Sequence, residues 1–204
     1  GEAIYYNWKY HDNGQKNGYH KIENYKNGKL HGLLTVDNQS DETVYTLIAN
    51  YQNGVLSGKY EEFYNEYGFK GYKNDSKVGY YKNGLFTGKV EVKTSYGGTQ
   101  ITYSERTENY DNGKLLSGKY EKGLDNRGPE LLEFYGADGF EGTRKEWYYE
   151  YDYDVREDNF GTLILEENFN KGKLHGTRKR WNDDGKLILE EKYINGELHF
   201  SKKY

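Results

Sequence analysis

An eight-residue pattern, Tyr-x-Asn-Gly-x-Leu-x-Gly, recurs along this 204-residue chain and constrains its fold more than any other feature. Asn-Gly is the dipeptide best suited to a type I′ turn, in which both central residues have positive φ. Such a turn joins two antiparallel strands and leaves the Tyr and the Leu at positions that can meet across the hairpin. The copies are Tyr25–Gly32, Tyr51–Gly58, Tyr81–Gly88, Tyr110–Gly118, Tyr135–Gly142, Phe169–Gly176 and Tyr193–Phe200. The pattern therefore predicts tandem β-hairpins.

The spacing of the copies predicts the domain organisation. Turn glycines are expected at positions 14, 28, 54, 84, 113, 139, 172 and 196, and Asn-Gly pairs occur at 13–14, 17–18, 27–28, 53–54, 83–84, 112–113 and 195–196. Leu163–Phe169 also matches Leu187–Tyr193 at an offset of 24 residues. We expect one repeat array over residues 1–204, with seven to eight units of roughly 24–33 residues, a degenerate first unit at 1–24 and an insertion at 146–158.

The composition agrees with a thin all-β structure. Only 34% of the residues are hydrophobic, which is too little for a thick globular core, but the chain holds 24 Tyr, 8 Phe and 3 Trp. Tyr buries a large ring while its hydroxyl stays in water, which suits a sheet whose side chains all lie near solvent. The same aromatic content argues against disorder. We therefore expect an all-β antiparallel meander.

The eight-residue pattern resembles the MORN repeat, in the variant that forms arrays in bacterial proteins, some of which are labelled antitoxin-like. The resemblance covers nearly the whole chain and is weakest over residues 1–24, 59–80 and 120–160. It implies an elongated, twisted antiparallel sheet with scaffolding or binding roles and no chemistry of its own. The irregular insertions and long second hairpins depart from the eukaryotic type, so a lipid-binding role is not carried over.

Several function classes find no support in the sequence. The 29 Lys and Arg are outnumbered by 33 Asp and Glu, and this balance does not favour a nucleic-acid partner. The absence of Cys removes thiol catalysis and Cys-based zinc sites. No apolar run reaches the length of a membrane span, and no nucleophile elbow, P-loop or dinucleotide fingerprint is present. We expect a non-enzymatic protein without a cofactor.

The histidines and one basic cluster are expected to be structural. His31, His175 and His199 occupy one repeat position, just after the Leu, and His11 and His20 lack zinc-ligand spacing, so no metal site is predicted. The cluster lies between two acidic pairs, 166–167 and 183–184, so we expect neighbouring strands to neutralise it. Its members are Lys171, Lys173, Arg178, Lys179 and Arg180.

The insertion at 146–158 is the candidate interaction surface. It holds six acids against one Arg, and four Tyr fall within six residues. Alternation of Tyr with acids fits an extended hairpin, and no EF-type loop follows the acids that could offer oxygens to Ca²⁺. Insertions in a repeat array often line its binding face. The candidate residues are Trp147, Tyr148, Tyr149, Tyr151, Asp152, Tyr153 and Asp154.

The function we expect is a repeat scaffold or protein-interaction module, because Tyr-rich strands offer rigid amphipathic contacts. The lack of Cys and a start without Met favour an exported bacterial protein of the cell surface or periplasm. One alternative is a cytoplasmic antitoxin or immunity protein that binds a cognate toxin. Another is a cell-wall or carbohydrate-binding repeat, for which only Trp8, Trp147 and Trp181 offer indole platforms.

Overall fold

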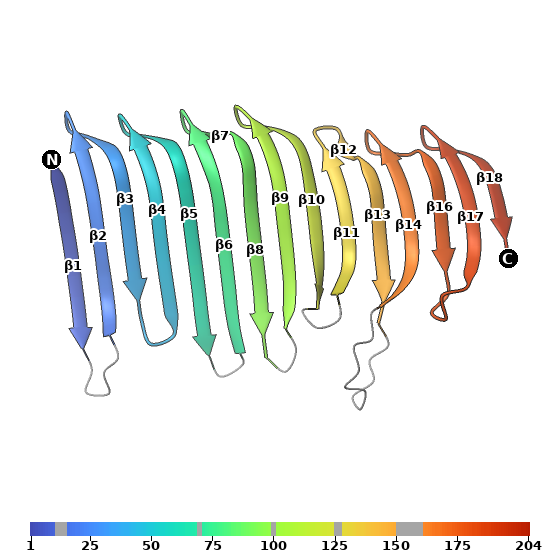
Figure 1. The fold of residues 1–204 in the computed structure, drawn as a ribbon, viewed down its shortest axis with the longest axis horizontal. Helices are drawn as coiled ribbons and strands as arrows, with labels where there is room; N and C mark the ends of the chain where they lie inside the picture. Colours follow the sequence, from blue (N-terminus) through green and yellow to red (C-terminus); the bar gives the residue numbers. More distant parts are fainter. Residues whose placement is uncertain (11–15, 69–70, 99–100, 125–127, 150–160) are drawn as a thin grey trace. The chain divides into compact units, whose positions relative to one another are not determined.

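The computed structural model describes residues 1–10, 16–68, 71–98, 101–124, 128–149 and 161–204, which form strands and turns and contain no helix (Figure 1). The first nine strands are β1 (Glu2–Tyr10), β2 (Lys16–Lys26), β3 (Lys29–Gln39), β4 (Thr43–Gln52), β5 (Val55–Gly68), β6 (Gly71–Lys82), β7 (Leu85–Phe86), β8 (Gly88–Gly97) and β9 (Thr102–Asp111). The remaining strands are β10 (Lys114–Leu124), β11 (Gly128–Gly136), β12 (Gly139–Phe140), β13 (Gly142–Tyr148), β14 (Thr162–Asn170), β15 (Lys173–Leu174), β16 (Gly176–Trp181), β17 (Leu187–Ile194) and β18 (Glu197–Lys203). The predicted all-β class is confirmed.

The strands follow one another in meander order, and the pairs with a resolved register are antiparallel. The chain divides into two compact units. The first unit comprises residues 1–99 and 107–114, and the second comprises 100–106 and 115–204. The two-residue strands β7, β12 and β15 each begin a longer strand that continues after a short break, so each hairpin contributes two strands. The predicted antiparallel meander of hairpins is confirmed.

The Asn-Gly pairs form the hairpin turns that the sequence predicts. Asn27 and Gly28 both have positive φ, 52° and 72°, as a type I′ turn requires. Across this turn Tyr25 pairs with Leu30, so the two apolar residues of the motif are direct cross-strand neighbours. The same pairing joins Tyr51 to Leu56, Tyr81 to Phe86, Phe169 to Leu174 and Tyr193 to Leu198.

Two turn positions differ from the expectation. Asn17 and Gly18 lie within β2, opposite Lys9 and Trp8, because continuous pairing of β1 with β2 overrides the local turn preference. A Cβ on Gly18 would stand 1.8 Å from a backbone oxygen, so close approach of the two strands accounts for this glycine. In the Tyr135 copy, Gly136 pairs with Gly139, which places the turn one residue before the predicted glycine. The pair 13–14 lies outside the described residues.

Successive hairpins are tied together at their turns. At five of the turns the peptide N–H of the turn glycine donates a hydrogen bond to the carbonyl of the Leu or Phe in the preceding hairpin. These bonds are Gly54 to Leu30, Gly84 to Leu56, Gly113 to Phe86, Gly172 to Phe140 and Gly196 to Leu174, at 2.7–2.9 Å. His31 Nδ1 accepts from the Asn53 N–H at 3.4 Å, and His175 Nδ1 accepts from Asn195 N–H at 3.3 Å. These two histidines therefore contact the next turn of the array.

The strand register shifts by one residue just before the Tyr of the motif, and an asparagine occupies this unpaired position. Its side-chain amide donates to the carbonyl of the residue after the second glycine, as from Asn24 to Leu33 at 2.8 Å and from Asn50 to Lys59 at 3.1 Å. The second glycine has positive φ at these bulges, 97° at Gly32. The working repeat is therefore one residue longer than the pattern visible in the sequence.

Candidate interaction surface

One row of residues crosses each unit and forms most of its thin core. We define this central row as the positions two residues before the motif's Tyr or Phe and two residues after its second Gly. In the first unit cross-strand pairing runs from Glu23 through Leu34, Ala49 and Tyr60 to Gly79, and Val90 lies against Gly79. Leu34, Ala49 and Val90 are at most 6% exposed. The middle of this row, from Leu34 to Val90, is therefore apolar, and the buried acids Glu23 and Glu108 occupy the row's outer positions.

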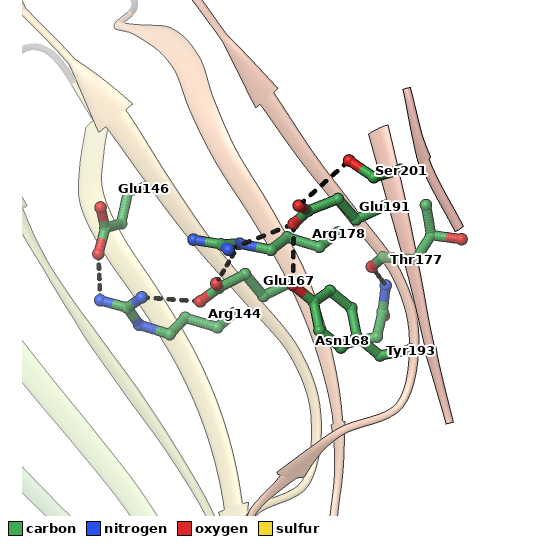
Figure 2. A network of polar contacts seen from close by, with 9 residues as sticks. All are labelled: Arg144, Glu146, Glu167, Asn168, Thr177, Arg178, Glu191, Tyr193 and Ser201. Atoms are coloured by element: carbon green, nitrogen blue, oxygen red, sulfur yellow. Dashed lines mark hydrogen bonds and ion pairs between the residues drawn. The ribbon is translucent and has the colours of Figure 1, made fainter. Parts of the chain in front are cut away.

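In the second unit the central row is ionic (Figure 2). Arg144 Nε lies 2.9 Å from Glu133 Oε1, and Arg144 Nη1 donates to Glu167 Oε2 at 3.0 Å. Arg178 Nε lies 2.9 Å from the other oxygen of Glu167, and Arg178 Nη1 donates to Glu191 Oε2 at 3.3 Å. Acids and arginines thus alternate from β11 to β17, and we call this series the ion-pair ladder.

Side groups complete the ladder. Arg144 also pairs with Glu146, two residues along the same strand. The hydroxyl of Tyr193 donates to Glu191 Oε2 at 3.0 Å, and the hydroxyl of Ser201 approaches the other oxygen at 3.5 Å. Burial opposes the charged form of Arg144, but the hydrogen bonds that Arg144 donates to Glu133 and Glu167 outweigh it and raise the pKa of Arg144. The arginines of the ladder are therefore held by acids within the chain.

Arg180 departs from this arrangement. It lies on β16 two residues after Arg178, and its cross-strand neighbours are Leu165 and Leu189. Its guanidinium is exposed and forms no ion pair with any acid in the described ranges. Its equivalent in the preceding hairpin is Glu146, which is paired with Arg144. Arg180, without an acid partner among the described residues, therefore lies beside a ladder whose arginines are ion-paired.

A depression of about 450 Å³ opens at Arg180, and we call it the Arg180 depression. Leu165, which is buried, pairs with Glu146 on one side and with Arg180 on the other, so these two charges flank a leucine floor. The side chains or backbone of nine residues line it: Glu146, Ile164, Leu165, Arg178, Arg180, Trp181, Asn182, Asp183 and Ile188. The depression therefore combines the apolar side chain of Leu165 with the guanidinium of Arg180, which has no acid partner among the described residues.

The opposite face of the first unit carries a second apolar row. Ile4 pairs with Ile22, Ile22 with Thr35 and Thr35 with Ile48, and the row continues through Glu61 to Val78. Since consecutive strand residues point to opposite faces, this aliphatic row lies on the face opposite the central row. Ile4 is 53% exposed and the nearby Tyr6 is 75% exposed. Among the described strands of this unit, the main contacts join strands that lie side by side in the sheet.

The structure separates the sequence-predicted site residues. Tyr149 is buried at 9% exposure, its hydroxyl donates to Pro129 O at 2.9 Å, and its ring lies over Gly161. Trp147 is half-buried opposite Leu163, and Tyr148 is exposed opposite Thr162. Tyr151, Asp152, Tyr153 and Asp154 lie outside the described residues.

Other site types are not formed by the part of the chain that the structure describes. It holds no group of three or more His, Asp or Glu placed to bind a metal ion. It also contains no helix long and apolar enough to cross a membrane. Neither a scan against protein-family models nor a search of curated proteins found a match for the chain.

Sequence reasoning missed the ladder and the Arg180 depression, although a signal for both was present. Residues 142–147 and 176–181 are identical at five of six positions, and both copies contain an arginine flanked by Thr and Lys. The one difference, Glu146 against Arg180, marks the place where the pairing pattern changes. The expected neutralisation of the basic cluster is observed at Arg178, which contacts Glu167 and Glu191, but not at Arg180.

Proposed function

We propose that this chain is a non-enzymatic protein-binding module that uses the faces of its β-sheet as binding surfaces. The observation that carries the proposal is the aliphatic row of the first unit, with Ile4 and Tyr6 exposed on a face over which no second layer of described residues packs. Exposed apolar patches of this kind mark sites of protein association. Rigid Tyr side chains add contact area at a small entropic cost.

The test uses two sets of variants on strand β1. Ile4→Lys with Tyr6→Lys places two charges on the face of the aliphatic row, and Tyr5→Lys places one charge on the opposite face of the same strand. Tyr5 is 46% exposed, so Tyr5→Lys is a control for adding a charge to an exposed position of this strand. Proteins retained by the wild-type chain are identified by mass spectrometry, and their affinities for the variants are measured with purified components. We expect the double variant to lose binding and Tyr5→Lys to keep it; equal affinities would refute the proposal.

A further inference from the structure

We infer that the Arg180 depression binds the C-terminal carboxylate of a polypeptide whose last residue is apolar. This inference rests on the proposed function, because it names the chemical group by which a protein partner would be recognised. Three features of the second unit support it: an arginine that pairs with no acid among the described residues, leucines on both sides of that arginine, and a depression whose volume lies in the range of small-ligand sites.

The first step concerns the charge of Arg180. Arg178 uses its guanidinium on Glu167 and Glu191, so the neighbouring Arg180 gains no acid from the ladder. In the preceding hairpin Glu146 occupies the equivalent position and supplies a carboxylate to Arg144. A ligand carboxylate at Arg180 would place an acid next to this arginine, as Glu146 is placed next to Arg144 in the preceding hairpin. The planar guanidinium offers two parallel N–H donors, which match the two oxygens of a carboxylate.

The second step concerns the apolar surroundings. Leu165 and Leu189 flank Arg180 across the sheet, and Ile164 and Ile188 line the same depression. An ion pair formed beside these side chains is less screened than one in open water. A carboxylate alone would leave the leucine floor uncovered, whereas a C-terminal Leu or Phe carries its side chain beside its carboxylate. The floor therefore favours an apolar C-terminal residue.

The third step concerns selectivity. Glu146 lies on the far side of Leu165 from Arg180, and Asp183 also lines the depression. These acids repel a ligand that carries several negative charges, such as a nucleic acid or a polyphosphate. A single carboxylate can lie at Arg180 and remain one leucine away from Glu146. The charge distribution therefore selects a monoanion over a polyanion.

The experiment uses the full chain and two acetylated peptides of sequence Ala-Ala-Ala-Leu, one with a free C-terminus and one amidated. Affinity is measured by calorimetry, and contact is followed by the NMR signal of the Arg180 Nε–H group. We expect the free peptide to bind about tenfold or more tightly than the amide, and Arg180→Gln to lose that difference. Lys179→Gln is the control, since Lys179 pairs with Glu166 and Glu190 on the other face.

Four outcomes would overturn the inference. Equal binding of the free and amidated peptides, or undiminished binding to Arg180→Gln, would remove the carboxylate contact. If binding appears only after residues 150–160 are deleted, then one of the five acids of that segment, and not a ligand, is the partner of Arg180. A natural partner that is lost from Ile4→Lys/Tyr6→Lys but retained by Arg180→Gln would end the inference and leave the proposed function standing. If the peptide binds at Arg180 but the wild-type chain retains no protein partner, the inference stands and the proposed function is refuted.

Discussion

The peptide N–H of Gly54 donates a 2.7 Å hydrogen bond to the carbonyl oxygen of Leu30, the leucine of the preceding hairpin. One motif can therefore supply both halves of the link: the copy at 51–58 offers its turn glycine, Gly54, to the hairpin before it and its leucine carbonyl, Leu56 O, to Gly84 of the hairpin after it. This explains why the Asn-Gly turn and the leucine recur together. Loss of the turn geometry should weaken two hairpins at once.

The glycines of the motif should be more sensitive to substitution than its histidine. Gly54→Ala places a Cβ at φ 85° and should cost about 1–2 kcal/mol in the free energy of unfolding. Gly58→Ala should cost more, because φ is 116° and the new Cβ would stand 3.0 Å from Asn50 Cβ. His31→Ala removes only a 3.4 Å contact and should cost least. Urea unfolding gives the order, and a larger loss for His31→Ala would contradict the turn-link account.

Breaking the ion-pair ladder at its centre should be more harmful than replacing it whole. Glu167 is buried between two arginines, so Glu167→Gln should lower the free energy of unfolding by about 2 kcal/mol. The quintuple variant Glu133→Gln, Arg144→Leu, Glu167→Ala, Arg178→Tyr and Glu191→Gln removes every charge of the ladder and copies Leu34–Ala49–Tyr60 of the first unit at its centre. It should melt above Glu167→Gln, since a row without charges can replace a buried ion network, whereas a half-removed network leaves acids without partners. Thermal unfolding followed by circular dichroism compares the two, and a lower melting temperature for the quintuple variant would count against equivalence of the rows.

The adjacent tyrosines of the predicted surface should behave in opposite ways. Tyr149→Ala empties a buried site and removes the hydrogen bond to Pro129 O, so about 3 kcal/mol of stability should be lost. Tyr148 is 41% exposed, and Tyr148→Ala should change stability by no more than about 0.5 kcal/mol. Denaturant unfolding of both variants decides the matter. Similar losses from the two would mean that the burial of Tyr149 contributes little.

Acid should destabilise the first unit partly through Glu23. The Lys21 ammonium lies 2.6 Å from this buried carboxylate and the Tyr25 hydroxyl donates to it at 2.9 Å, so the pKa of Glu23 is held below its usual range despite burial. The folded state then binds fewer protons than the unfolded state, and this stability is lost as the pH falls below about 4.3. Between about pH 5 and 3, Glu23→Gln should lose less stability than the wild type. A slope for Glu23→Gln parallel to that of the wild type would remove Glu23 as the cause.

The turns were predictable because their chemistry is local. Asn27–Gly28 needs only its own backbone preference to specify a hairpin, and the pairing of Tyr25 with Leu30 follows from the two-residue turn. Asn17–Gly18 shows the limit of that argument, because the same dipeptide lies inside a strand once nine cross-strand pairs hold β1 against β2. Local preference decides a turn only where long-range pairing leaves it free.

The candidate site could not be predicted in the same way, because it depends on register across strands far apart in sequence. Glu133 and Arg144 are eleven residues apart, and Arg144 and Glu167 are twenty-three apart. Their alignment depends on the bulges beside each turn, which one sequence does not reveal. The sequence alone does not show that the cross-strand neighbours of Arg180 are Leu165 and Leu189, neither of which is an acid.

The central row also gives the two units different responses to solvent. The Leu34–Ala49 portion is held by burial of apolar surface, which salts such as sulfate strengthen. The ladder is held by charge, but its members are largely shielded from solvent, so dissolved ions screen it less than the exposed pairs Lys59–Glu61 and Lys89–Glu91 of the first unit. A simple salt should therefore weaken the surface ion pairs of residues 1–99 before it weakens the ladder, whereas sulfate should strengthen the apolar part of the first unit. The kind of salt, as well as its concentration, sets how each unit responds.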